Sequence, residues 1–390
     1  MTEQSSWIWN TPNAHFIRHF PDEPIGYFSP DALKSKMSIF QSGFDGILSY
    51  AVKANPHPDV LRCLTQNGVS VFDVASPAEI EMVRRIAPTA KLNYHNPVRS
   101  VQEIAKAKLQ GIASWSVDAL SELDKLGDLP EGSEIAVRIK LSVAGGLYNF
   151  GEKFGAEPAQ AVPLLKAVVA RGLGPAITFH PGTQCLSPGA WESYIKAASK
   201  IAQDAGVRLQ TLNVGGGFPG DRGAKPVDLK VIFNRIKAAK ERYFSDHNPV
   251  LICEPGRGLV ADAFALVLRV KNMRPNGAVV LNDGIYGALA EWRDMPPVHP
   301  RHITVFNPKG AERRGKPASR VIFGPTCDSL DRLSDPLALP ADIAEGDFVL
   351  IQGTGAYSAV LTSRFNGYGC AKQIFCTALK STSRHFQVSG

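Results

Sequence analysis

The chain has 390 residues, 44% of them hydrophobic, a length and composition that predict a large core and two domains. Its net charge of +7 comes from dispersed basic residues, which is typical of a solvated surface rather than of a nucleic-acid-binding face. No apolar run reaches the roughly 18 residues that a membrane-spanning helix requires, so a membrane protein is not expected.

The six cysteines form no C-x-x-C pair, which argues against a zinc site and against a disulfide framework. The first six residues lack the basic and apolar regions of a signal peptide. We therefore expect a cytoplasmic protein that binds no metal.

Short apolar segments alternate with helical patterns between about residues 46 and 254. The strands are expected at residues 46–52, 69–74, 91–95, 113–117, 134–141, 176–180, 209–214 and 250–254. One of the intervening helices is expected from Pro77 to Ile86, because Ile80, Val83 and Ile86 recur at helical spacing. This alternation predicts an α/β fold with a (β/α)8 barrel over residues 36–262, and such barrels carry their active sites at the C-terminal ends of the strands.

After about residue 262 the helical patterns give way to short strands with Pro- and Gly-rich turns. These strands are expected at residues 263–270, 278–281, 302–305, 319–323 and 347–352. They predict a second, mostly β domain, a sandwich or a barrel, over residues 263–390. Residues 1–35 lie outside the βα repeat and are expected to join this β domain, because chain termini often lie close together.

Polar residues and glycines end most of the predicted barrel strands. They are Lys53, Asp73, His95, Asp118, Arg138, His180, Gly215 to Gly217 and Glu254. A lysine can form a covalent Schiff base with a carbonyl group if burial or neighbouring charges lower its pKa. An ordinary surface lysine after a strand remains the alternative for Lys53.

A glycine run and a Glu-Pro-Gly-Arg segment follow the last two barrel strands. Gly215, Gly216 and Gly217 can bring backbone N–H groups close to a phosphate, although a flexible loop would have the same composition. Glu254 can hydrogen-bond a heterocycle nitrogen and Arg257 can pair with a phosphate, unless the two form an ion pair that closes the barrel. A lysine, a glycine run, a glutamate and an arginine together describe a pyridoxal phosphate site.

Further candidate residues lie in two other segments. His180 can stack on an aromatic ring and Thr183 can donate to a phosphate, although a lone histidine often only supports structure. In the Gly-Pro-Thr-Cys-Asp segment beyond the barrel, Cys327 can donate a proton and Asp328 can anchor a cationic side chain. A turn with a buried thiol is the alternative there, and Tyr357 in Gly-Ala-Tyr is a weak signal by itself.

Taken together, the motifs resemble the pyridoxal-phosphate-dependent ornithine, lysine and diaminopimelate decarboxylases of the alanine-racemase-like fold, in the eukaryotic-type ornithine decarboxylase branch. The resemblance runs from about Tyr27 to Tyr368. The matching motifs begin at Tyr50 (Tyr-Ala-Val-Lys-Ala-Asn), Phe72 (Phe-Asp-Val-Ala-Ser), His180, Gly215 (Gly-Gly-Gly-Phe-Pro-Gly), Glu254 (Glu-Pro-Gly-Arg), Asn282 (Asn-Asp-Gly-Ile-Tyr-Gly), Gly324 (Gly-Pro-Thr-Cys-Asp-Ser-Leu-Asp), Gly355 and Phe365. So many motifs in the same order make the match specific.

The resemblance implies a pyridoxal 5′-phosphate enzyme and a role for each matching residue. Lys53 corresponds to the lysine that bonds to the cofactor aldehyde, His180 to the residue stacked on the ring, and Glu254 to the partner of the pyridine nitrogen. The phosphate contacts correspond to Thr183, Gly215, Gly216, Gly217, Arg257 and Tyr357, and the polar residues that support the ring and the lysine linkage correspond to Asp73 and Arg138. Cys327 and Asp328 correspond to residues that reach the active site of the other subunit, which implies a homodimer with shared sites.

The implied reaction is decarboxylation of a basic L-amino acid, most simply L-ornithine to putrescine in polyamine biosynthesis. L-Lysine to cadaverine, or a dual activity, remains open because one methylene changes binding by only about 1–3 kcal/mol. Asp-Ser-Leu-Asp follows Cys327, where diaminopimelate decarboxylases usually carry Glu-Ser-Gly-Asp, and this difference disfavours diaminopimelate. Glu254 disfavours a racemase, which usually places an arginine at the pyridine nitrogen, and the retained cofactor residues disfavour a non-catalytic regulator.

The chain departs from the family pattern at two places. Pro181 follows the histidine where the family has a small aliphatic residue, and proline removes a backbone donor and stiffens the loop. Residues 290–294 also differ, and Asp294 is the candidate for the second substrate-binding aspartate of ornithine decarboxylases, about one residue out of register. The identity of the substrate therefore depends on a segment where the motif does not match.

Overall fold

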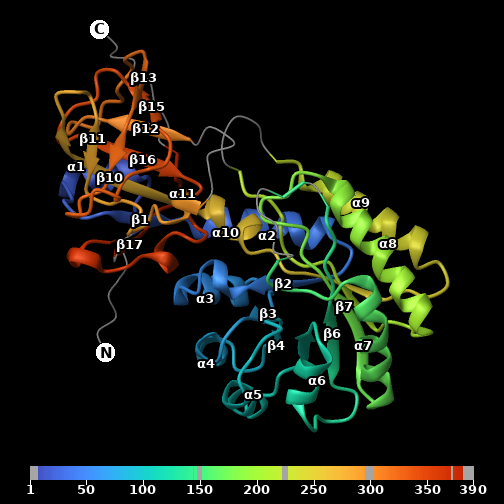
Figure 1. Cartoon of the computed structure of the whole chain (residues 1–390). Helices are drawn as coiled ribbons and strands as arrows, with labels where there is room; N and C mark the ends of the chain where they lie inside the picture. The colour runs from blue at the N-terminus through green and yellow to red at the C-terminus, as the bar shows by residue number, and fades with distance from the viewer. Residues whose placement is uncertain are drawn as a thin grey trace. The chain divides into compact units, whose positions relative to one another are not determined.

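The computed structural model describes residues 8–143, 145–146, 152–221, 227–294, 302–369 and 372–380. The chain divides into two compact units (Figure 1). A β-rich unit comprises Met1–Leu33, Asp221–Lys225 and Val260–Gly390, and a barrel unit comprises Lys34–Gly220 and Pro226–Leu259. Within the described residues, every helix falls short of the length or the apolarity that a membrane span needs.

The barrel unit is a closed ring of eight parallel strands in the part of the chain that the structure describes, which confirms the predicted fold class. The strands are β2 (Ile47–Ala51), β3 (Val71–Val74), β4 (Lys91–Tyr94), β5 (Ser114–Val117), β6 (Glu134–Arg138), β7 (Gly174–Thr178), β8 (Thr211–Asn213) and β9 (Val250–Cys253). They follow one another around the ring in chain order, and β9 pairs with β2 to close it. Most of their residues are buried, because both faces of a barrel strand are covered, and the strands therefore read as apolar runs.

Helices precede, connect and follow these strands, and sequence signals mark where several of them begin. The helices are α2 (Pro30–Gly43), α3 (Pro58–Gln66), α4 (Pro77–Ile86), α5 (Val101–Lys108), α6 (Leu120–Leu126), α7 (Pro158–Ala170), α8 (Pro188–Ala205), α9 (Leu229–Tyr243) and α10 (Arg257–Val260). Proline opens α3, α4, α7 and α8, where its missing N–H would have no helical partner. Ser100 and Glu103 form a reciprocal capping box at the start of α5.

The β-rich unit is built on a sheet in the order β12-β16-β10-β1-β17, with β11 pairing with β10 and β14 with β11. Its elements are α1 (Pro12–His19), β1 (Ile25–Phe28), β10 (Phe264–Met273), β11 (Val279–Leu281), α11 (Glu291–Asp294), β12 (Ile303–Phe306), β13 (Pro317–Arg320), β14 (Ile322–Phe323), β15 (Leu337–Pro340), β16 (Phe348–Gln352) and β17 (Lys372–Phe375). Alternate residues of β10 enter different hydrophobic clusters, Leu266 and Leu268 on one face and Ala265 and Val267 on the other. The central strand is therefore covered on both faces.

Two features of this unit differ from the sequence prediction. The single strand expected at residues 319–323 is wrong, because β13 pairs with β15 while β14 pairs with β11. The N-terminal strand β1 was not predicted; it pairs antiparallel with β10 and parallel with β17. Both errors concern strands of four residues or fewer, which are too short to show a clear alternation.

Candidate active site

Lys53 and Asp73 lie side by side at the C-terminal ends of adjacent strands. Lys53 sits in a short 3₁₀ turn, Val52–Ala54, directly after β2, and the β2–β3 register pairs Ala51 with Asp73. The Lys53 Nζ lies 3.3 Å from Asp73 Oδ2, with the lysine side chain 46% exposed and the aspartate 3% exposed. Burial and the charge of Glu254 raise the pKa of Asp73, while Lys53 and His95 oppose that rise. A reachable amine beside a buried carboxylate suits a lysine that must exchange partners.

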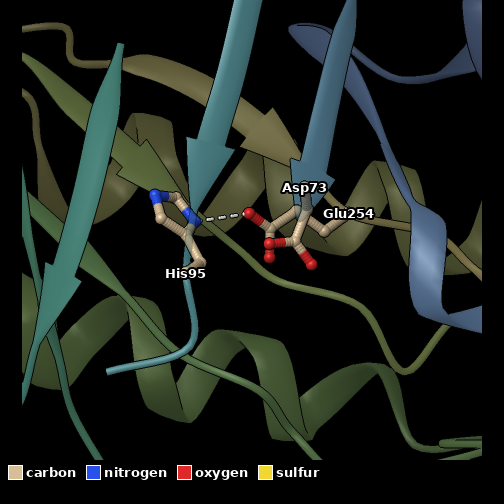
Figure 2. Close-up of side chains that lie close together, drawn as sticks. All are labelled: Asp73, His95 and Glu254. Carbon is tan, nitrogen blue, oxygen red and sulfur yellow. Dashed lines mark hydrogen bonds and ion pairs between the residues drawn. The ribbon is translucent and has the colours of Figure 1, made fainter. Parts of the chain in front are cut away.

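Glu254 follows β9, and its carboxylate meets His95, which follows β4 (Figure 2). Glu254 Oε1 lies 2.6 Å from His95 Nδ1 and accepts a hydrogen bond from Asn213 Nδ2 at 2.6 Å. Burial alone would raise the pKa of Glu254, but His95, Lys53 and Asn213 outweigh it and lower the pKa to about 2. The carboxylate is therefore ionised at neutral pH.

Asp73, His95 and Glu254 bring their ligand atoms within 4.8 Å of one another, a spacing that can also suit a metal ion. His95 and Glu254 are already joined by a hydrogen bond, and Lys53 is paired with Asp73. The positive charges of the amine and a protonated imidazole can therefore balance the two carboxylates without a metal ion.

His180 follows β7 and is half-buried and uncharged. Its Nδ1 accepts the backbone N–H of Gly182 at 3.1 Å, and burial together with the charges of Lys53 and Arg138 lowers the pKa of His180 to about 3. Arg138 ends β6, where burial lowers its pKa and the charges of Glu254 and Asp73 oppose that effect. A neutral imidazole can lie against an aromatic ring without desolvating a charge.

The glycine run after β8 forms a turn with no room for side chains. A Cβ on Gly215 would overlap the carbonyl of Phe179; one on Gly216 would lie 2.8 Å from the Glu254 carbonyl; and one on Gly217 would lie 2.5 Å from the Gly182 carbonyl. Gly215 and Gly217 also have positive φ, at 67° and 83°. A bare backbone turn of this kind is able to approach a phosphate group closely.

The loop that carries His180 and Thr183 is tied to this glycine turn. Gln184 donates to the carbonyl of Gly220 at 2.7 Å and accepts its N–H at 3.2 Å, and the Cys185 N–H donates to the carbonyl of Gly217 at 2.9 Å. Pro181 Cγ would lie 3.1 Å from a Cβ at Gly217, so the proline ring packs against the turn. The departure at Pro181 therefore stiffens a contact with the predicted phosphate loop and leaves that loop in place.

Arg257 begins α10 and is buried, with 6% exposure. The segment before it packs on the lysine turn, because a Cβ on Gly256 would lie 2.7 Å from Ala54 Cβ and the Ala51 N–H donates to the Pro255 carbonyl. The barrel thus gathers an amine, an ionised carboxylate, a neutral imidazole and a bare backbone turn at one end. This donor set fits pyridoxal phosphate, whose aldehyde, ring nitrogen, ring face and phosphate need these four kinds of group.

Cys327, Asp328 and Tyr357 lie in the β-rich unit. Asp328 Oδ2 accepts the hydroxyl of Tyr286 at 2.5 Å, and this hydrogen bond lowers the pKa of Asp328. The N–H of the exposed Cys327 donates to Asn366 Oδ1 at 3.2 Å. Tyr357 has a positive φ of 54°, which is uncommon for a residue with a side chain. Asp294 is the last residue of α11, and its side chain lies outside the described part of the structure.

The Cys327 loop is anchored by a buried carboxylate. Asp331, 1% exposed, accepts the N–H and the hydroxyl of Thr326 at 3.1 and 2.8 Å, and the N–H of Ile285 at 3.0 Å. It therefore fixes the two motifs that carry Asp328 and Tyr286 against each other.

Asn213 and Ser114 were not predicted to have a role, and His95 was predicted only to end a strand. Asn213 ends β8 and bonds Glu254, while the Ser114 hydroxyl lies 2.9 Å from His95 Nε2. A polar residue at the end of a buried strand was the available signal. Asp118 instead accepts the N–H of Gly155 and holds a neighbouring loop.

Residues 31–261 match the family model described as pyridoxal-dependent decarboxylase, pyridoxal binding domain. The lysine/ornithine decarboxylase of Selenomonas ruminantium is 33% identical over 334 residues, covering 83% of this chain and 82% of that protein. The ornithine decarboxylase of Mus musculus is 29% identical over 345 residues, with coverage of 82% and 73%. The solved lysine/ornithine decarboxylase of Vibrio vulnificus, complexed with cadaverine, gives a TM-score of 0.78 at 26% identity, covering 93% of this chain and 94% of that one.

Proposed function

Because the chain belongs to the pyridoxal-dependent decarboxylase family, we propose that it removes the α-carboxylate of a basic L-amino acid, with L-ornithine preferred over L-lysine. The observation that carries this proposal is the ionised carboxylate of Glu254 at the same barrel end as Lys53. The products would be putrescine and CO2, in polyamine biosynthesis. L-Lysine, or both substrates, is the alternative that the lysine/ornithine relatives support.

Pyridoxal phosphate, when bound, accepts the electron pair that remains on Cα as CO2 leaves. Glu254 would hold the pyridine nitrogen protonated, because an ionised carboxylate stabilises a positive charge beside it. Lys53 would hold the aldehyde and then exchange with the substrate amine, while neutral His180 would lie against the ring. The phosphate contacts would come from Thr183, Gly215, Gly216, Gly217, Arg257 and Tyr357, and Asp73 and Arg138 would support the charged groups around the ring.

The substrate side chain would be held by the β-rich unit. Asp328 presents an ionised carboxylate, whose Oδ2 accepts the Tyr286 hydroxyl and whose Oδ1 accepts the N–H of Leu330 at 2.9 Å. These two hydrogen bonds orient the carboxylate, and each oxygen keeps a further lone pair that would face an ammonium group. The exposed thiol of Cys327 would return a proton to Cα, and Asp294 remains the candidate for a second contact. We further propose a homodimer in which Cys327 and Asp328 serve the partner's barrel, as the resemblance implies, and a cytoplasmic location.

The proposal predicts a clear order of substrates in a CO2-release assay of the protein loaded with pyridoxal phosphate. The panel is ornithine, lysine, arginine, diaminopimelate, methionine and the aromatic amino acids. We expect the highest kcat/KM with ornithine or lysine, because both end in an ammonium group that can meet Asp328. Preference for another member, or no CO2 from any of them, would reject the proposed substrate class.

Asp328→Asn is expected to raise KM for the preferred diamino acid about tenfold to hundredfold, because the amide keeps the shape and loses the charge-assisted contact. The affinity for pyridoxal phosphate should stay within about twofold, since Asp328 is not among the residues proposed to contact the cofactor. Steady-state kinetics and cofactor titration measure the two effects. Asp335→Asn, at an exposed position of the same unit, is the matched control. An unchanged KM in Asp328→Asn would place the side-chain anchor elsewhere.

A further inference from the structure

His95 has no role in the proposed function, yet it makes a short, buried contact with Glu254. Its Nδ1 lies 2.6 Å from Glu254 Oε1, and its Nε2 lies 2.9 Å from the Ser114 hydroxyl on β5. The side chains of His95 and Glu254 are 4% and 9% exposed. A partner at each ring nitrogen fixes the orientation of the imidazole.

The hydrogen-bond pattern determines where the protons lie. An ionised carboxylate only accepts, so Nδ1 of His95 carries a proton. The amide of Asn213 is oriented by the Gly215 N–H, which donates to its Oδ1 at 2.9 Å, so its Nδ2 also donates to Glu254 Oε1. Burial lowers the pKa of His95, but the charges of Glu254, Asp73 and Glu134 outweigh burial and raise the pKa above its ordinary value. His95 is therefore an imidazolium whose Nε2–H donates to Ser114.

These contacts leave the two oxygens of Glu254 in different situations. Oε1 accepts from both His95 and Asn213, and within the described residues no group donates to Oε2. We infer that His95 is a positioning residue that keeps Glu254 ionised and directs its Oε2 to the pyridine nitrogen of pyridoxal phosphate. This inference rests on the proposed role of Glu254 and extends it.

A carboxylate and a pyridine nitrogen that face each other share one proton, and this proton stays on the stronger base. Without His95, burial and the nearby charge of Asp73 would both favour a protonated Glu254. An imidazolium at 2.6 Å makes the carboxylate the weaker base, so that the proton remains on the nitrogen. The imidazolium contacts the carboxylate directly, whereas a pyridine nitrogen at Oε2 lies on the far side of the carboxylate. The positive charge of His95 therefore lowers the basicity of the carboxylate more than that of the nitrogen.

The first test uses the protein without cofactor or substrate. In apo-protein carrying ¹³C-labelled histidine, we expect one of the nine histidines to stay protonated well above pH 6.5. That signal should be absent in His95→Asn and should titrate at lower pH in Glu254→Gln. If one variant fails to fold, the other still assigns the signal to His95. A His95 signal that titrates at or below pH 6.5 in the wild type would overturn the inference. The substrate plays no part, so this failure and a failure of the proposed function are distinguishable.

The second test separates positioning from packing. His95→Asn retains a neutral donor near Nδ1 and is expected to lower kcat about 10- to 100-fold, the usual effect of losing an outer partner, with KM within about threefold. The absorbance of bound pyridoxal phosphate should also depend on pH differently in His95→Asn than in the wild type. His247→Asn, at a mostly buried histidine of the same unit, is the matched control and should change neither quantity. An unchanged kcat and pH profile in His95→Asn would reduce His95 to a structural role.

The same pair predicts how the stability of the apo-protein depends on pH. Because its folded pKa is raised, His95 stabilises the fold fully below about pH 6.5, and this contribution is lost as the pH rises through the raised value. Glu254 contributes above about pH 4.5 and loses its contribution as the pH falls through about 2. The Tm difference between the wild type and His95→Asn should therefore be largest near pH 5–6 and narrow above it. A difference that does not narrow as the pH rises would contradict the ion pair.

Discussion

Replacement of Lys53 by alanine is expected to abolish covalent attachment of pyridoxal phosphate and to lower kcat by at least about 10³-fold. Lys53 supplies an amine at the end of β2 that pairs with the buried Asp73, and alanine offers nothing that can bond to the cofactor aldehyde. Attachment is measured by intact mass after borohydride reduction, and turnover by CO2 release. Lys34→Ala, at an exposed position of α2, should retain both.

Mixing Lys53→Ala with Cys327→Ala tests the shared sites at the same time. If each barrel is completed by the partner's β-rich unit, a mixed dimer contains one site with both native residues, and CO2 release should return to about a quarter of the wild-type value. No recovery from two inactive variants that exchange subunits would reject the shared site. Substantial turnover by Lys53→Ala alone would remove this lysine from its proposed role.

Glu254→Gln is expected to lower kcat about 10²- to 10³-fold, which is the usual loss when one preorganised electrostatic group is removed from an active site. Glutamine keeps the size of the side chain and an oxygen for the Asn213 donor, but it carries no charge to hold a proton on the pyridine nitrogen. Cofactor affinity should fall much less, because the glycine turn and Lys53 are intact. Single-turnover CO2 release and pyridoxal phosphate titration measure the two quantities.

The contrast with Glu192→Gln makes this prediction specific. Glu192 lies on the surface helix α8 and accepts a hydrogen bond from Arg235, so its replacement should leave kcat within about threefold. A Glu254→Gln protein with nearly wild-type kcat would mean that another group protonates the ring.

The sequence predicted the barrel well because each strand is an apolar run that stops at a polar residue, as β3 does near Asp73 and β9 before Glu254. It could not predict the contact between His95 and Glu254. The two residues are 159 positions apart, and β4 and β9 are not neighbours in the barrel. The two side chains meet across the end of the barrel. A local sequence pattern does not predict which side chains of non-neighbouring strands come into contact there.

The β-rich unit was predicted less completely for a different reason. The four residues of β15, Leu337–Pro340, give too few positions to show alternation, and β17 pairs with β1 from almost 350 residues away. Asp331 belongs to the Gly-Pro-Thr-Cys-Asp-Ser-Leu-Asp motif, but the motif alone does not predict its role. Asp331 fixes the loop of Asp328 by accepting from two backbone N–H groups and one hydroxyl, which only the fold brings together.

The pairing of β1 with β10 and β17 also sets the order of events on the ribosome. Residues 25–28 leave the exit tunnel early, yet their partners begin only at residues 264 and 372. At translation rates of about 5–20 residues per second, the first strand waits roughly 10–50 seconds for β10 while the whole barrel is made. The barrel is therefore complete as a folding unit before the nascent N-terminus finds its sheet, and during that interval β1 is an unpaired edge for chaperones to protect.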